Sequence, residues 1–218
     1  MADWRLRLFQ QPLLPAGHRP RRMVQLLAGL VLYGVTDAMV LASGLGVEPW
    51  DALAQGLSRT AGLSVGLWTN LIGALVLLLW IPLRQKPGLG TVCNILIVGT
   101  SMDLALIVLP VPGSAAESWT LLLAGTALNG LATGCYIGAD AGTGPRDGLM
   151  TGIAALGHPL WAVRLAIELT VLAAGFLLGA TVGVGTVIYA LAIGPLAHLL
   201  IPLFQIRPAP GPRGDGVG

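Results

Sequence analysis

Apolar runs long enough to cross a lipid bilayer dominate this chain. A helix of about 20 apolar residues spans the hydrocarbon core, and short breaks separate six such runs, at 23–43, 65–83, 91–109, 119–139, 160–180 and 186–203. Only 10% of the 218 residues are charged, against about a quarter in an ordinary soluble domain. The pattern predicts an all-α integral membrane protein with six transmembrane helices.

Two further apolar runs, 50–60 and 146–156, are much shorter. Each follows a proline, and at about 1.5 Å per residue neither can cross a bilayer core of about 30 Å. We expect both to be re-entrant half-helices, which enter the membrane and return to the same side.

The chain also contains two copies of one hydrophobic unit. The two copies align with one single-residue gap, and the aligned positions cover nearly the whole apolar region. Matched pairs include Leu26–Gly29 with Leu122–Gly125, Pro49 with Pro145, Asp51 with Asp147, and Gly88–Thr91 with Gly183–Thr186. The predicted organisation is a basic N-terminal segment (1–22), membrane repeat 1 (23–110), membrane repeat 2 (118–204) and a disordered tail (205–218).

The distribution of basic residues predicts the orientation. If the half-helices do not cross, the N-terminal arginines, Arg84, Lys86 and Arg207 share one side, while the loop with Glu117 lies on the other. This is the positive-inside pattern. Three crossings per copy make the repeats inverted, with both termini cytoplasmic at a cell (inner) membrane. If the half-helices cross instead, Arg84 and Lys86 lie on the opposite side and the repeats run the same way.

The loops that precede the half-helices are the candidate solute-binding site. Their glycines permit irregular backbone, and the proline suits a first helical turn. Two facing helix N-termini would present N–H groups and partial positive charge, which favours an anionic group. The candidate binding residues are Glu48, Pro49, Asp51, Gly142, Gly144, Pro145, Arg146 and Asp147. Alternatively, Asp51 and Asp147 only cap their own helices, and the two roles can coexist. Glu48 and Arg146 have no counterpart in the other copy.

Ionisable residues inside the apolar runs form a second group, because charge in a membrane helix is costly. Arg164 and Glu168 are four residues apart on one helix face, which predicts a structural ion pair. Asp37, Asp103 and His198 are candidates for proton coupling. For Asp103 and His198, which lie near predicted helix ends, the alternative is contact with interfacial water.

No sequence motif indicates an enzyme, a cofactor or a metal. The two cysteines, Cys93 and Cys135, lie inside apolar runs, and no nucleotide loop, zinc spacing or catalytic triad is present. No basic face indicates nucleic acid. Most tryptophans, including Trp50 and Trp80, lie near predicted span ends, which is typical of an interfacial aromatic belt.

Several stretches resemble the YczE/YyaS/YitT group of bacterial membrane proteins. They are Gly44-x-Gly-x-x-Pro-Trp-Asp51, Gly142-Thr-Gly-Pro-Arg-Asp-Gly-Leu-Met150 and Gly183-Val-Gly-Thr186. The resemblance implies a multi-pass inner-membrane protein of unsettled biochemical role. Some members are linked by context to peptide antibiotic production. The resemblance implies no catalytic residues in this chain.

Together these patterns predict a transporter of a small solute through a central site between the repeats. The alternative is a non-transporting membrane accessory or scaffold protein for a biosynthetic partner. The chain offers little polar surface for such a partner, which favours transport. The lipid bilayer is the expected surrounding, and a homo-oligomer is compatible with the sequence.

Overall fold

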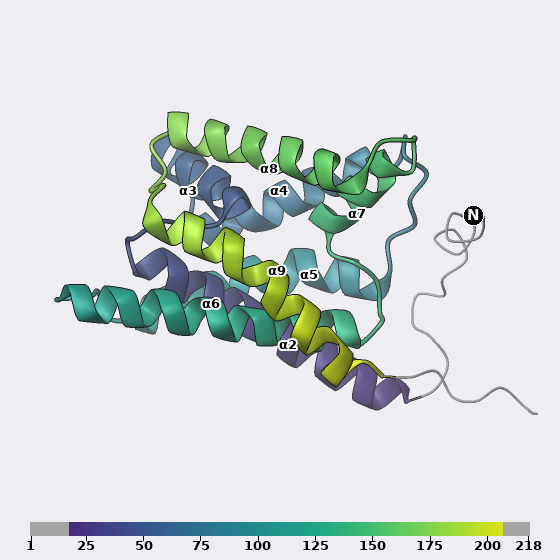
Figure 1. Ribbon diagram of the computed structural model, residues 1–218, viewed down its shortest axis with the longest axis horizontal. Coiled ribbons are helices and arrows are strands. Elements are labelled where there is room, and N and C mark those ends of the chain that lie inside the picture. The colour runs from purple at the N-terminus through teal and green to yellow at the C-terminus, as the bar shows by residue number, and fades with distance from the viewer. Residues whose placement is uncertain (1–17, 207–218) are drawn as a thin grey trace, which may run out of the picture.

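The computed structural model describes residues 18–206, and in that range it contains eight helices and no strand (Figure 1). They are α2 (Arg19–Ala42), α3 (Pro49–Ala61), α4 (Val65–Leu79), α5 (Leu89–Val108), α6 (Ala115–Gly138), α7 (Pro145–Ala154), α8 (Leu160–Leu177) and α9 (Val184–Phe204). The all-helical prediction is confirmed.

The two copies begin their helices with the same local devices. Helices α2 and α6 each have 24 residues, and α3 and α7 each begin at a proline. At the starts of α5 and α9 a threonine hydroxyl turns back to the chain. Thr91 accepts the Gly88 N–H at 3.2 Å, and Thr186 accepts the Gly183 N–H at 3.4 Å. The duplication seen in the sequence is therefore a duplication of local structure.

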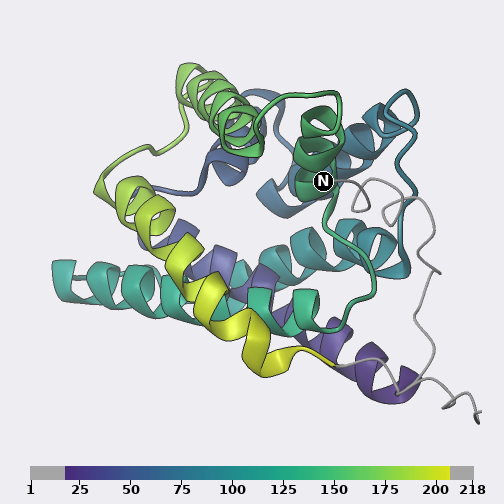
Figure 2. The ribbon, with the colours of Figure 1, turned by 45° about the vertical axis from the view of Figure 1, so that its right-hand side comes forward.

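The helices form two layers, one of α2, α5, α6 and α9 and one of α3, α4, α7 and α8 (Figures 1 and 2). Glycines allow close approach in the first layer. Facing pairs are Gly29 with Tyr136, Gly34 with Val98, Gly125 with Val40, Gly130 with Leu196, and Gly138 with Phe204; Ala38 packs with Met102. These pairs show that α2 lies parallel to α5, α6 lies parallel to α9, and α2 is antiparallel to α6.

The segment that contains each short helix begins and ends beside the same connection of the other copy. Before α3, the Leu45 carbonyl accepts the Gly185 N–H at 2.8 Å, and at the end of α3 Arg59 donates to the Thr181 hydroxyl at 2.9 Å. Both ends of this segment therefore lie beside the α8–α9 connection. The segment that leads through α7 likewise begins and ends beside the α4–α5 connection, since Ala141 bonds to Gly90 and Gly152 faces Gln85.

The long helices differ from the six predicted spans in one place. Five helices (α2, α5, α6, α8 and α9) are long and apolar enough to cross a membrane, and α3 with α4 makes a sixth only as one span bent by 116°. The run expected at 65–83 ends as a helix at Leu79 because Trp80 turns into the other copy. Its indole packs on Gly148 and donates to the Pro145 carbonyl at 3.0 Å.

The described ends of the chain are tied into the first layer. Arg22, expected in the basic segment, is fully buried and donates to the carbonyls of Ala139 at 2.8 Å and Ile206 at 2.9 Å. Asp140 lies 3.7 Å from its guanidinium. Residues 1–17 and 207–218, most of the predicted N-terminal segment and tail, lie outside the described residues.

The position of Arg22 makes a prediction about stability. Arg22→Gln removes charge-assisted hydrogen bonds and leaves buried carbonyls unpaired, so we expect it to lower the free energy of unfolding by about 2–3 kcal/mol. Thermal denaturation in detergent measures this. The control is Arg21→Gln, one residue away and exposed, which should denature like the unmodified protein. Equal denaturation of the two variants would contradict the role of Arg22.

Candidate functional site

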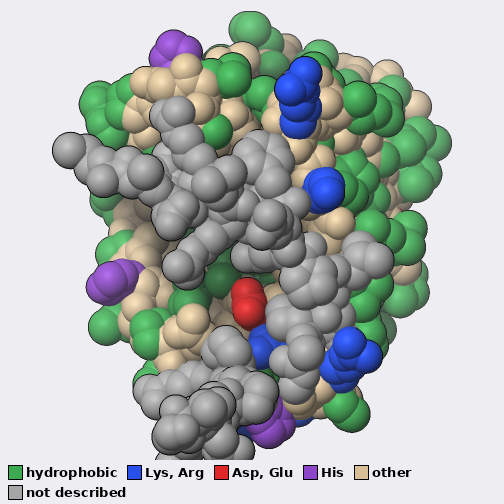
Figure 3. All heavy atoms as spheres, turned by 90° about the vertical axis from the view of Figure 1, so that its right-hand side faces the viewer, with side chains coloured by type: hydrophobic (Ala, Val, Ile, Leu, Met, Phe, Trp, Pro, Cys, Tyr) green, Lys and Arg blue, Asp and Glu red, His purple; other side chains and the backbone are tan. Residues whose placement is uncertain are grey.

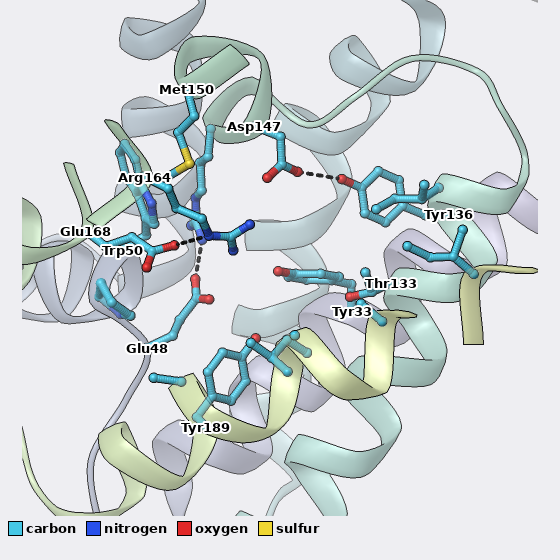
Figure 4. Close-up of a pocket in the computed structure, with 18 residues that line it drawn as sticks. Tyr33, Glu48, Trp50, Thr133, Tyr136, Asp147, Met150, Arg164, Glu168 and Tyr189 are labelled. Atoms are coloured by element: carbon cyan, nitrogen blue, oxygen red, sulfur yellow. Dashed lines mark hydrogen bonds and ion pairs between the residues drawn. The ribbon is translucent and has the colours of Figure 1, made fainter. Parts of the chain in front are cut away.

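A cavity of about 450 Å³ opens where the N-termini of α3 and α7 meet (Figure 4). Its walls come from both copies. Polar and aromatic lining residues are Tyr33, Glu48, Trp50, Thr133, Tyr136, Arg146, Asp147, Arg164, Glu168 and Tyr189, and α9 adds apolar residues such as Ile193, Ala197 and Ile201. Space of this size is in the range of small-molecule sites.

The extended residues before each proline place the charged side chains in this space. Glu48 and Gly144 both have extended backbone, and the helix begins at the next residue. The ion pair between Glu48 and Arg146 joins the starts of α3 and α7, and Figure 4 shows Glu48 and Asp147 at the same space. Glu48, Pro49, Arg146 and Asp147, four of the eight candidate binding residues, line this cavity.

Arg146 carries the central positive charge and is held between two carboxylates of the other copy. Its guanidinium forms an ion pair with Glu48 and lies 3.6 Å from Asp51, whose side chain is only 2% exposed. The same guanidinium stands over the Trp50 ring, 5.4 Å from its centroid, which is a cation–π arrangement. The two residues without repeat counterparts, Glu48 and Arg146, therefore bind each other.

Asp147 has a different environment from Asp51. Its Oδ2 accepts the Tyr136 hydroxyl at 3.2 Å, and the Tyr136 oxygen in turn accepts the Gly144 N–H at 3.3 Å. Among residues 18–206 no ion pair involves Asp147. Neither Asp51 nor Asp147 bonds to the N–H groups of its own helix start, so both carboxylates interact with site residues instead of capping.

The Arg164–Glu168 pair predicted from spacing is present, with Nε to Oε1 at 2.8 Å. Its position adds something that the spacing did not indicate. Both side chains line the cavity, and Arg164 is 54% exposed. The pair is thus part of the wall of the site.

A buried network lies behind this wall. The Asn129 amide donates to Asp37 Oδ1 at 2.8 Å and to the Thr36 hydroxyl at 2.9 Å, and it accepts the Tyr189 hydroxyl at 2.8 Å. The other oxygen of Asp37 has no hydrogen-bond partner among residues 18–206. Since Tyr189 lines the cavity, the network links Asp37 to the site through two side chains.

The other two proton-coupling candidates lie elsewhere. Asp103 accepts the Gly66 N–H at 2.8 Å and the Ser64 hydroxyl at 2.5 Å, at the start of α4. His198 is exposed on α9. Of the three, only Asp37 is connected to the cavity wall.

Some assignments from sequence differ from the structure. Gly142 does not line the cavity; it has φ +117° and packs against Gly88. Trp50 and Trp80 are 6% and 3% exposed, so neither belongs to an interfacial belt. The tyrosines of the site were missed, because a single tyrosine in an apolar run carries no periodic signal.

Comparison with known proteins gives a family and no activity. A family of unknown function (DUF6198) matches residues 20–202. An uncharacterized protein of Haemophilus influenzae is 35% identical over 184 residues, 84% of each chain. Two Bacillus subtilis proteins are similar over most of their length: the uncharacterized membrane protein YczE (33% identity, 80% of this chain and 83% of YczE) and YyaS (29%, 81% and 90%). No solved structure matches. The resemblance to YczE and YyaS is confirmed, and the chain is a multi-pass membrane protein.

The Arg146 cluster predicts a stability effect. Arg146→Gln leaves two buried carboxylates without their cation, so we expect a loss of about 3–5 kcal/mol in the free energy of unfolding. Adding Glu48→Gln should recover part of that loss. The matched control is Arg164→Gln, whose half-exposed pair should contribute about 1 kcal/mol or less. Denaturation of the single and double variants in detergent tests this, and an Arg146→Gln effect no larger than the control's would contradict it.

Proposed function

We propose that this chain, which belongs to the family of unknown function DUF6198, carries a small solute across a membrane through the cavity at the α3 and α7 helix starts. The observation behind this proposal is the cavity itself. Charged side chains from both copies surround about 450 Å³ of space within a bundle of apolar helices. Ionisable groups at membrane depth are costly, and they typically mark a solute path.

The proposed arrangement in the bilayer has six crossings, by α2, α4 and α5 in one copy and by α6, α8 and α9 in the other. Helices α3 and α7 re-enter without crossing, in keeping with the position of both ends of each segment beside a single connection of the other copy. The antiparallel relation of the α2/α5 and α6/α9 pairs supports inverted repeats, and transporters of that plan place their site where broken helices meet. The 15 residues of α4 span about 22 Å, which a locally thinned bilayer accommodates.

Basic residues support a cytoplasmic position for one end of the molecule. Figure 3 views the end where α2 begins and α6 ends; Lys and Arg side chains lie on this end, and apolar side chains cover the flank. Arg21, Arg84 and Lys86 are exposed there, whereas Arg59 lies beside the α8–α9 connection at the other end. By the positive-inside rule the first end faces the cytoplasm of a bacterial cell.

Charge balance favours a positively charged group on the solute. The helix starts that would attract an anion already hold Glu48, Asp51 and Asp147, carboxylates of the protein itself. Three carboxylates and two guanidiniums line the cavity, with Asp37 and Asp51 behind them. The aromatic faces of the lining also suit an organic cation. We therefore propose a small organic cation in place of the anion expected from the helix dipoles alone.

The topology is tested by thiol labelling in a Cys93→Ser/Cys135→Ser background. We expect a membrane-impermeant maleimide added outside intact cells to label Val111→Cys, in the α5–α6 connection, and to leave Lys86→Cys unlabelled. Permeabilised cells provide the control, since both thiols should then react. Labelling of Lys86→Cys from outside would refute the proposed arrangement, in which α4 crosses the membrane and α3 does not.

Flux is tested with purified protein in proteoliposomes. The panel contains tetramethylammonium and guanidinium as cations, and gluconate and succinate as anions. Asp147→Asn should lower cation flux at least about tenfold, as expected for the loss of one charge-assisted bond of about 1.5–3 kcal/mol. Glu117→Gln, an exposed acid in the first turn of α6, is the matched control and should transport normally.

The possible results separate the parts of this proposal. Flux of succinate without flux of cations would refute the assigned charge and leave transport standing. No flux of any panel member, with no shift in denaturation temperature on adding them, would refute transport of these solutes and favour the accessory-protein alternative.

A further inference from the structure

A second, much smaller cavity of about 40 Å³ lies on the α4–α5 side of the site. It shares four lining residues with the large cavity: Tyr33, Tyr136, Arg146 and Asp147. The remaining lining comes from α4, α5 and the start of α7. The two cavities are therefore separate approaches to one group of central side chains.

The sequence repeat relates these two cavities to each other. Residues that line the small cavity occupy the positions that, in the other copy, line the large one. The corresponding pairs are Thr69 and Arg164, Gly73 and Glu168, Asn94 and Tyr189, Ile95 and Ala190, Val98 and Ile193, and Pro145 and Pro49. One approach is thus collapsed and its counterpart is open.

Close packing of α4 on α5 shuts the small approach. A Cβ added at Gly66 would lie 1.9 Å from the Gly99 carbonyl oxygen, so these backbones touch. The Asn70 side chain accepts the Gly99 N–H at 3.0 Å. At the far end Asp103 accepts from Gly66 and Ser64, which fastens α5 to the positive N-terminus of α4.

The equivalent pair of helices in the other copy is apart. Among the described helices α4 packs on α5, but α8 and α9 are not packed on each other. A Cβ added at Gly194, the counterpart of Gly99, meets nothing within 4 Å. Ala197 lines the open cavity where the other copy has Met102, which is fully buried.

We propose that the small cavity is the closed form of a second entrance to the same site, and that the protein alternates between the two entrances. This inference rests on the proposed transport function. In the structure the large cavity extends along α9 towards Ile201, at the end where α6 and α9 terminate. The small cavity lies between α4 and α5, and the Ser64–Asp103 contact between these two helices lies at the opposite end of the bundle. The solute site is therefore open to one side of the membrane and shut from the other.

The protein changes from one entrance to the other when α8 closes on α9 and α4 separates from α5. Closing brings Glu168 towards Ala190, as Gly73 now lies against Ile95. Opening separates Asp103 from the start of α4. His198, the counterpart of Asp103, has no such partner in the described structure. The hydrogen bonds from Ser64 and Gly66 to Asp103 therefore hold only one of the two entrances closed.

Disulfide trapping tests the exchange without any solute, again in the Cys93→Ser/Cys135→Ser background. The built Cβ of Gly73 lies 3.9 Å from the Ile95 Cβ, within the range of about 3.5–4.5 Å for a disulfide. Gly73→Cys/Ile95→Cys should oxidise rapidly and lock the structure seen. Its repeat counterpart, Glu168→Cys/Ala190→Cys, should also oxidise completely, but at a rate at least about tenfold lower. The rate is lower because these two positions approach each other only in the minor state.

The second half of the experiment examines the closed entrance. The Val98→Cys substitution is combined with Glu168→Cys/Ala190→Cys. After the 168/190 disulfide has formed, Cys at position 98 should react with a small maleimide at least about tenfold faster than in the reduced protein, because the former minor state is then the whole population. Failure of the 168/190 pair to oxidise, with both thiols reactive to maleimide, would overturn the proposal. So would oxidation of that pair with no gain in Val98→Cys labelling.

These outcomes are independent of the flux measurement. Flux without trapping at 168/190 would mean a fixed path, so that transport stands and alternation fails. Trapping with a newly reactive Val98→Cys, but without flux of any panel solute, would mean that the two-state bundle exists and that the proposed transport of those solutes fails.

Discussion

Two stretches of irregular backbone inside an apolar bundle must find hydrogen-bond partners, and the rest of the structure depends on how they do so. Such backbone is tolerated at membrane depth only where protein or water satisfies it. Here each copy satisfies the other: Leu45 accepts from Gly185, and Ala141 accepts from Gly90, both at 2.8 Å. Each copy therefore supplies the hydrogen-bond partner for the irregular backbone of the other copy. These hydrogen bonds hold the α3 and α7 helix starts in one place.

The backbone hydrogen bonds between the two copies also explain why a charged site can exist in this chain. A lone guanidinium in an apolar bundle would be strongly destabilising, but the meeting of the two helix starts places Arg146 between Glu48 and Asp51. The repeat provides the geometry, and divergence within it provides the chemistry. Trp50 stands where the other copy has Arg146, and its ring lies under that guanidinium. Each copy thus contributes a different part of one cluster.

Periodicity and self-comparison predicted the helices, the duplication, the short Pro-led helices and the Arg164–Glu168 pair, because these depend on residues near in sequence or equivalent between copies. Partners distant in the chain were not predictable in this way. Arg22 looked like a surface charge, since nothing near it in sequence indicates the carbonyls of Ala139 and Ile206. Likewise α4 ends early because Trp80 packs on Gly148 of the other copy. Such contacts need the tertiary arrangement.

The distribution of burial indicates which part of the bundle can move at low cost. Within their most apolar windows α2 and α6 are 44% and 50% buried, whereas α8 and α9 are 11% and 6% buried. Helices α2 and α6 hold each other through glycine contacts that a shift would break, so they form the fixed frame. Helices α8 and α9 lie mostly against the surroundings, and lipid contacts re-form wherever a helix stands. Within the protein, α9 is held to α6 by the Gly130–Leu196 and Gly138–Phe204 contacts, and α8 packs on α3. The proposed change in the gap between α8 and α9 is therefore a movement of α8 with α3 relative to α9 with α6. It is opposed mainly by the Asp103 hydrogen bonds to the start of α4 and by the α4–α5 backbone contact.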